Sequence, residues 1–255
     1  MQNLDLLDPT RSRPIPVAYY PARSPSKGWL LFSVGFGGAR SGYAFLARAW
    51  SEMGLDVAVI EHVGSNLEVL KSLQRPGMRA AELAHLVGQF VQQGPELEER
   101  PLDLLYVRQQ LCPGARWAGC AGHSFGAYTA AAVCLRAAWQ GACLLSPSPP
   151  GNRLSGADYA QLQLPVFVLT GTLDSGMPAG VTYQDRLQAF AALPTGQRYL
   201  ALLEGADHMA LAGVGLQVGP ITRSLTQLTS AFWQSLLEKR PPQWPECEVE
   251  TTLAV

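Results

Sequence analysis

The segment Gly122-His-Ser-Phe-Gly126 carries the clearest chemical signal in the chain, because a serine stands between glycines two residues away on either side. It lies where an expected strand, Arg116–Ala121, gives way to an expected helix from about Phe125 to Ala138. Strand and helix approach each other closely at such a turn, and the turn lifts the serine hydroxyl clear of the backbone. The pattern predicts a nucleophilic Ser124; the alternative is a glycine-rich turn that holds an ordinary serine.

A serine hydroxyl is a poor nucleophile until a histidine takes its proton, and that histidine needs a carboxylate to orient it. The sequence has four histidines, and only His208 lies after Ser124. The turn resembles that of α/β-hydrolases, in which the serine is followed along the chain by the acid and then by the histidine. This order selects His208 as the base, against the alternative of an ordinary surface histidine.

Asp174 is the predicted acid, because it follows the expected strand Pro165–Thr170 and can lie at the same edge of a sheet as Ser124. A loop-capping aspartate is the alternative interpretation of Asp174. Three other acids are weaker candidates for this role. Asp158 precedes that strand, Asp185 lies within an expected helix, and Asp207 adjoins the histidine. The predicted triad is therefore Ser124, Asp174 and His208.

Two backbone N–H groups are needed to stabilise the oxyanion that forms when a serine attacks an ester carbonyl. The N–H of Phe125 is one expected donor, and the loop Ser33-Val-Gly-Phe-Gly-Gly38 supplies the second, from Phe36 or, failing that, Gly37. Apolar residues flank these motifs, and each is a candidate for an apolar acyl pocket or for ordinary core packing: Phe36, Tyr43, Phe125, Met177 and Met209.

Short apolar runs alternate with segments of helical periodicity along most of the chain, as in Gly28–Val34 followed by Tyr43–Met53. Such alternation predicts an α/β fold, with a mostly parallel central sheet and helices on both faces. We expect a single domain over residues 1–240. The proline- and glutamate-rich tail, residues 241–255, is expected to be extended or loosely ordered.

Several motifs together resemble the α/β-hydrolase superfamily over about Gly28 to Leu211, and more narrowly its serine-nucleophile, dienelactone-hydrolase-like and platelet-activating factor acetylhydrolase-like esterases. The motifs are Gly35-Phe-Gly-Gly38, Glu61-His-Val-Gly-Ser-Asn66, Arg100-Pro-Leu-Asp103, Gly122-His-Ser-Phe-Gly126, Gly171-Thr-Leu-Asp174 and Gly205-Ala-Asp-His208. The chain has Val34-Gly35 where relatives often have His-Gly, and Ser124 where true dienelactone hydrolases have cysteine. His62 and Asp103 are expected to brace loops rather than to take part in chemistry.

The resemblance and the predicted triad imply a serine hydrolase that cleaves carboxylic esters of short to medium acyl chains through a covalent acyl-enzyme. A hydrolase fold that has lost catalysis and serves only for binding is one alternative. Dinucleotide binding is a weaker one: Gly35-x-Gly37 follows a strand and Glu61 ends the next, but Arg40 stands where a third glycine is needed.

Composition excludes other classes of partner. Lys and Arg number 19 against 20 Asp and Glu, so no net field attracts the chain to nucleic acid, and no apolar run is long enough to span a membrane. No histidines or cysteines stand at metal-ligand spacing, so neither a metal nor another cofactor is expected, only a small ester substrate. Five scattered cysteines and a start unlike a signal peptide indicate the cytoplasm.

Overall fold

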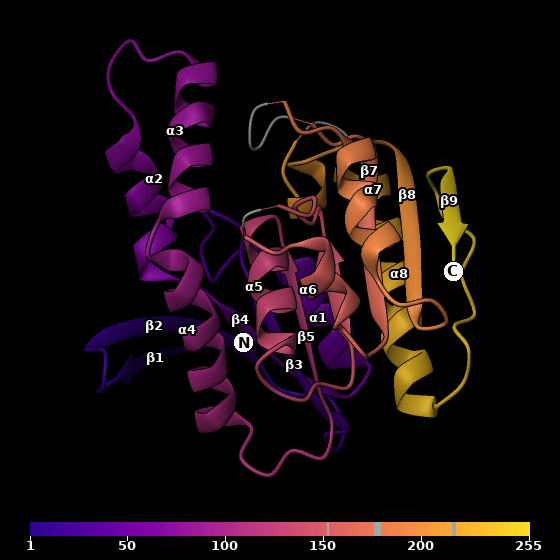
Figure 1. Cartoon of the computed structure of the whole chain (residues 1–255). Helices are drawn as coiled ribbons and strands as arrows, with labels where there is room; N and C mark the ends of the chain where they lie inside the picture. The colour runs from indigo at the N-terminus through magenta and orange to yellow at the C-terminus, as the bar shows by residue number, and fades with distance from the viewer. Residues whose placement is uncertain (152, 176–179, 216–217) are drawn as a thin grey trace.

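The computed structural model describes residues 1–151, 153–175, 180–215 and 218–255. A nine-stranded sheet runs through the described part of the chain, in the order β1-β2-β4-β3-β5-β6-β7-β8-β9 (Figure 1). The strands are Gln2–Asp8 (β1), Arg13–Tyr20 (β2), Gly28–Ser33 (β3), Leu55–Ile60 (β4), Ala118–His123 (β5), Ala142–Leu145 (β6), Val166–Leu173 (β7), Arg198–Asp207 (β8) and Thr251–Ala254 (β9).

The strands from β3 to β8 are mutually parallel, whereas β1, β2 and β9 pair antiparallel with their neighbours. The parallel strands are short apolar runs, and every residue of β4, β5 and β6 is buried. Parallel strands have such continuous apolar sequences because other elements cover both faces of the sheet. The predicted α/β architecture is confirmed.

Helices cover both faces of the sheet (Figure 1). They are Ala44–Glu52 (α1), Leu67–Leu73 (α2), Ala80–Gln93 (α3), Glu96–Leu111 (α4), Phe125–Cys134 (α5), Gly156–Ala160 (α6), Tyr183–Ala192 (α7) and Val218–Glu238 (α8), with short 3-10 turns at Val63–Ser65 (η1) and Ala210–Ala212 (η2). One hydrophobic core joins the sheet to α3–α7, and a second joins it to α1 and α8. Adjacent strand residues such as Leu30 and Leu31 serve opposite cores, because side chains alternate across a strand.

The sequence predicts a helix over Leu102–Leu111, but α4 begins earlier, at Glu96, so Pro101 lies inside it. A proline within a helix leaves the carbonyl four residues earlier without its usual N–H donor. Here the hydroxyl of Tyr128 donates to that carbonyl, of Leu97, at 2.9 Å. A side chain from α5 therefore replaces the missing backbone hydrogen bond.

Both ends of the chain form strands that the sequence did not clearly indicate. Strand β2 contains Pro14 and Pro16, which disfavour a strand assignment, yet it lies between β1 and β4. At the other end, residues 251–254 of the tail form β9, an edge strand paired with β8. The tail also packs Trp244 against Phe167, with ring centroids 4.9 Å apart.

Candidate active site

Ser124 occupies the turn between β5 and α5 in a strained backbone conformation, with φ of 57° and ψ of −118°. A non-glycine residue with positive φ is uncommon and is found at functional turns. The turn is possible because its flanking residues lack side chains. A Cβ on Gly122 would overlap the carbonyl oxygen of Gly126, and one on Gly126 would overlap that of Ser33.

The structure brings Ser124, His208 and Asp174 into one hydrogen-bonded chain. The Oγ of Ser124 lies 3.0 Å from Nε2 of His208, and Nδ1 of the same ring lies 2.8 Å from Oδ1 of Asp174. Both distances allow proton transfer or ring orientation without any rearrangement. Three residues widely separated in the sequence thus have the geometry expected of a nucleophile, a base and an orienting acid.

The carboxylate of Asp174 is buried among donors. Ser146 and Thr170 donate to Oδ2 at 2.5 Å and 2.7 Å, and Nε of Arg186 lies 3.0 Å from Oδ1. Burial raises the pKa of Asp174. The His208 hydrogen bond, the Arg186 charge and the Ser146 hydroxyl together lower it by a larger amount, so the net pKa lies well below its ordinary value. Asp174 is therefore ionised and positioned to orient His208.

Of the two N–H groups expected as the second oxyanion donor, that of Gly37 is already engaged in a hydrogen bond. The N–H of Gly37 donates to the carbonyl of Ser65 at 2.8 Å. Among the hydrogen bonds of the described residues, none uses the N–H of Phe36 or that of Phe125. Both of these residues line the cleft at Ser124, so the geometry favours Phe36 over Gly37 as the second oxyanion donor.

Arg100, fully buried on α4, holds this loop in place. Its guanidinium donates to the hydroxyls of Ser33, Ser65 and Thr129 and to the carbonyl oxygen of Val34. It also lies over the ring of Phe125, with the guanidinium carbon 4.4 Å from the centroid. Burial lowers the pKa of Arg100 to about 9, while nearby acids such as Glu96 oppose the shift.

His62 and Asp103 form part of the same support. Nδ1 of His62 lies 2.8 Å from Oδ2 of Asp103, and its Nε2 lies 2.9 Å from the hydroxyl of Ser33. Asp103 also accepts a hydrogen bond from Arg13 on β2 at 2.8 Å. Both residues therefore connect β2, β3 and α4 behind the site, as expected of bracing residues.

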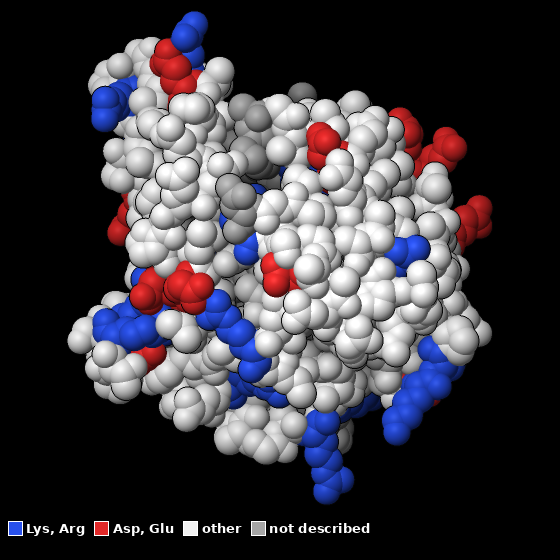
Figure 2. Space-filling view, viewed as in Figure 1, with Lys and Arg blue, Asp and Glu red and all other residues white. Residues whose placement is uncertain are grey.

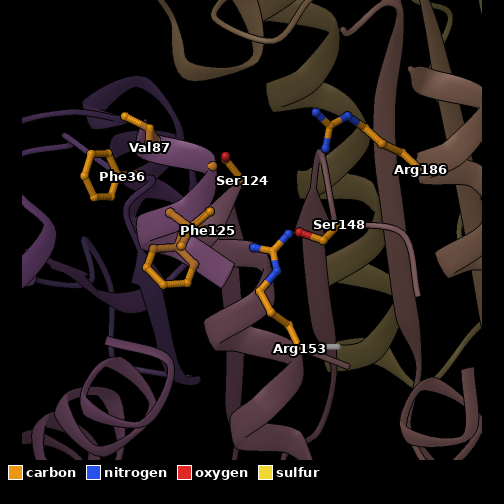
Figure 3. Close-up of a pocket in the computed structure, with 9 residues that line it drawn as sticks. Phe36, Val87, Ser124, Phe125, Ser148, Arg153 and Arg186 are labelled. Carbon is orange, nitrogen blue, oxygen red and sulfur yellow. The ribbon is translucent and has the colours of Figure 1, made fainter. Parts of the chain in front are cut away.

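A cleft beside Ser124 has about 350 Å³ of empty space, part of it open to solvent. Figure 3 shows side chains of opposite character on its two sides. The residues that line it are Phe36, Val87, Gly88, Val91, Ser124, Phe125, Ser148, Arg153 and Arg186. Helix α3, which stands at one end of the molecule beside α2 (Figure 1), supplies three of these nine residues.

Two further candidates for the acyl pocket, Tyr43 and Met209, are not among the residues that line the cleft. Tyr43 does not line the cleft, contrary to expectation, because its buried ring packs against Phe32 and its hydroxyl lies 2.8 Å from Nδ1 of His123. Met209 follows His208 but is 50% exposed and is not among the lining residues. Met177 lies outside the described residues.

The acids that ranked below Asp174 have local structural roles. Asp158 accepts hydrogen bonds from Ser155 at the start of α6, and Asp185 does the same for Thr182 at the start of α7. Asp207 accepts from the N–H of Ala210 at 2.7 Å. Capping boxes stabilise the N-termini of α6 and α7, which explains Asp158 and Asp185 without any chemistry.

The acidic residue that suggested a dinucleotide site is also engaged. The carboxylate of Glu61 accepts from the backbone N–H of Arg40 at 2.9 Å and from the side-chain amide of Asn66 at 3.0 Å. It therefore joins the loops after β3 and β4. Within the described ranges, no group of three or more His, Cys, Asp or Glu side chains could hold a metal ion.

Five polar residues at the site were not foreseen. Ser146, Thr170 and Arg186 surround Asp174, while Ser148 and Arg153 line the cleft. A weak signal existed for Ser146 and Thr170, because each stands near the carboxyl end of an expected strand. No local sequence motif indicates a role for Arg153 or Arg186. Their positions at the site depend on how the loop after β6 and α7 pack.

On the face shown in Figure 2, charged side chains lie at several separate places. Figure 2 shows both signs close together near β1, β2 and α4 at the lower left, and no broad surface of one sign on this face. No described helix combines the length and apolar character needed to cross a bilayer.

Neither a protein-family model nor a curated protein sequence matches the chain. Solved structures do. A ferulic acid esterase from Streptomyces cinnamoneus is similar with a TM-score of 0.67 and 18% identity, over 98% of this chain and 94% of that one. An alpha-beta serine hydrolase homologue from Coxiella burnetii is similar with a TM-score of 0.57 and 14% identity, over 93% and 96% of the two chains. The chain has the α/β-hydrolase fold.

A dienelactone hydrolase from Anabaena variabilis shares this α/β-hydrolase fold, with a TM-score of 0.59 and 17% identity over 91% of this chain and 97% of that one. The expected resemblance is thus confirmed at the level of the fold. In this α/β-hydrolase fold the carboxyl ends of the parallel strands carry the site, with Ser124 after β5, Asp174 after β7 and His208 at the end of β8. Ligands of open α/β sheets bind at this edge.

Proposed function

We propose that the protein is a serine esterase that cleaves carboxylic esters of short to medium acyl chains through a covalent acyl-enzyme. The observation that carries the proposal is the hydrogen-bonded chain from Ser124 through His208 to Asp174, at 3.0 Å and 2.8 Å. That the similar structures include a protein named as an ester hydrolase supports the same reaction class.

In the first half of the reaction, Nε2 of His208 accepts the hydroxyl proton of Ser124 while Oγ attacks the ester carbonyl carbon. The N–H groups of Phe36 and Phe125 donate to the oxyanion that forms. The tetrahedral intermediate then collapses, the bond to the alcohol oxygen breaks, and His208 returns its proton to the leaving alcohol. Asp174 fixes the ring tautomer and stabilises the imidazolium.

In the second half, His208 takes a proton from water, which attacks the acyl-enzyme carbonyl. The intermediate collapses, the bond from the carbonyl carbon to Oγ breaks, and His208 returns the proton to Oγ, so the acid leaves and Ser124 is regenerated. The apolar wall formed by Phe36, Val87 and Val91 supports an acyl or alcohol group of modest size, because the cleft contains only about 350 Å³. Apolar contacts there hold the ester without competing for the polar groups at Ser124.

The test combines a fluorophosphonate probe with a series of p-nitrophenyl acyl esters of increasing chain length. We expect labelling of the wild type, and a fall in kcat of roughly 10⁴- to 10⁶-fold in Ser124→Ala and His208→Ala. Ser72→Ala, on the exposed surface of α2, is the matched control and keeps full activity. Absence of both labelling and turnover in the wild type would contradict the proposal and favour a binding protein.

A further inference from the structure

The cleft beside Ser124 has one apolar and one cationic side. Phe36, Val87 and Phe125 lie on one side of the serine, whereas Ser148 and Arg153 lie on the other (Figure 3). The guanidinium of Arg153 points up toward Ser148 and the space next to Ser124 (Figure 3). A simple alkyl ester can contact the apolar side of the cleft, but it carries no charged group that would pair with the cationic side.

The two arginines of the cleft differ in how their charge is balanced. Arg186 forms an ion pair with Asp174 and donates to the carbonyl oxygens of Ser146 and Pro147 at 3.3 Å and 3.1 Å. Arg153 has no ion pair or hydrogen bond with any described residue, and the described lining of the cleft contains no acid.

The nearest recorded contact of Arg153 is with an aromatic ring, since its guanidinium carbon lies 6.0 Å from the centroid of Tyr128. Burial lowers the pKa of Arg153 below its ordinary value, and the charge of Arg186 adds to the effect. A partly buried guanidinium with no counter-charge is electrostatically unfavourable, and an anion placed in the cleft would relieve that cost.

We propose that Arg153 binds a carboxylate carried by the substrate while the scissile carbonyl lies at Ser124. The inference rests on the proposed esterase function and narrows its substrates to esters with an apolar segment at one end and a carboxylate at the other. A planar guanidinium can pair with a carboxylate through two parallel N–H···O bonds, which sets orientation as well as charge. Arg153 is then a specificity-determining residue.

Two matched ester pairs test this proposal, and each pair differs only in whether a carboxyl group is free or methylated. The first compares monomethyl adipate with dimethyl adipate and places the charge on the acyl side. The second compares para-acetoxybenzoate with its methyl ester and places the charge on the alcohol side. In at least one pair, we expect kcat/KM to be about 10- to 100-fold higher for the anion.

The variant Arg153→Gln should reduce this preference, which is the ratio of kcat/KM for the anionic ester to kcat/KM for the neutral ester, to near unity. Arg153→Lys keeps the charge without the planar fork and should retain part of the preference. Arg75→Gln is the matched control, because it removes one exposed positive charge and should leave the preference unchanged. Thermal unfolding of each variant establishes that it is folded.

A preference that is absent from both pairs in the wild type, or that survives in Arg153→Gln, overturns the inference. If neutral esters are nevertheless hydrolysed and the fluorophosphonate labels Ser124, the proposed esterase function is supported and only the inference about Arg153 fails. Binding gives a readout independent of turnover: adipate should stabilise Ser124→Ala against heat but not the Ser124→Ala, Arg153→Gln double variant. Equal stabilisation of the two would overturn the inference even in a protein without esterase activity.

Discussion

Asp174 is held by four side chains, two at each carboxylate oxygen. His208 and Arg186 approach Oδ1, while Ser146 and Thr170 approach Oδ2. All four present hydrogen atoms, so the site requires an acceptor at both oxygens. An acid in such a setting can orient a histidine with little freedom of its own.

Replacing Asp174 with Asn should lower kcat by about 10⁴-fold, because an amide NH₂ must face a donor and the wrong His208 tautomer is favoured. Turnover of p-nitrophenyl acetate measures the loss. Asp185→Asn serves as the control, since it alters only the N-terminal cap of α7 and should reduce stability by about 1 kcal/mol or less with kcat unchanged. Comparable losses of kcat in both variants would argue against a specific role for Asp174.

His62 links stability to pH. Burial, followed by the charge of Arg100, lowers the pKa of His62 from an ordinary 6.5 to about 4, despite the opposing hydrogen bond with Asp103. Between these values the unfolded chain binds the proton and the folded chain does not, so stability is complete above pH 6.5 and falls as pH drops to 4. The loss is up to about 3 kcal/mol, at about 1.4 kcal/mol per pH unit.

Urea unfolding at several pH values measures this slope. In His62→Asn we expect a shallower slope, with the remainder due to His123, whose pKa burial also lowers. An unchanged slope in the variant would show that His62 is not the source.

The sequence predicts site residues best where a local motif marks them. Ser124 is predicted as the nucleophile from its glycine neighbours, and His208 as the base because no other histidine follows Ser124. For Arg153 and Tyr43, the sequence did not predict whether the side chain lines the cleft. Which side of the sheet each side chain faces depends on packing between distant segments, and no spacing encodes that.

Among the elements, the β5–α5 turn depends on two small residues. Gly126 has no room for a side chain, because a Cβ there would overlap the carbonyl oxygen of Ser33 in β3. Backbone atoms cannot move aside as the end of a flexible side chain can. The turn is therefore intolerant of any substitution at this glycine.

Gly126→Ala should reduce the free energy of unfolding by more than about 3 kcal/mol, as overpacking against rigid backbone does. The midpoint of urea unfolding measures the change. Gly156→Ala, in α6, is the matched control: a Cβ there meets nothing within 4 Å, so stability should stay the same or rise slightly. A mild effect of Gly126→Ala would mean that β3 and α5 can separate.

Elements were predictable where the apolar pattern was strong, as in β3 and α1. The prediction failed where tertiary contacts override a local preference. Pro101 is accommodated by the hydroxyl of Tyr128 in α5, a partner distant in sequence. Pro14 and Pro16 are tolerated because they lie in the part of β2 that pairs with β1, whereas the pairing with β4 begins at Val17.

Over the whole molecule, the terminal strands cover the edges of the parallel sheet. Strand β9 pairs with β8 from Leu200 opposite Ala254 to Leu203 opposite Thr251. An uncovered edge presents free N–H and C=O groups that can pair with other chains. Strand β9 is itself an edge strand, but it has only four residues, and short edge strands pair less readily with other chains than a long strand such as β8.

Deletion of residues 249–255 should lower Tm and increase light scattering on warming, because β8 becomes an exposed edge. Deletion of Val255 alone keeps β9 and should behave as the full chain does. Scattering that is the same for both deletions would indicate that β9 has no protective role.

Arg100 is tied to β3, η1, α5 and the loop that carries Phe36, all from a single buried position on α4. These bonds form when the chain folds, long before an ester arrives. In the proposed reaction, the backbone N–H groups at the site are already oriented when negative charge develops on a carbonyl oxygen, so little reorganisation free energy accompanies that charge. The folding of the chain then supplies part of the proposed transition-state stabilisation in advance.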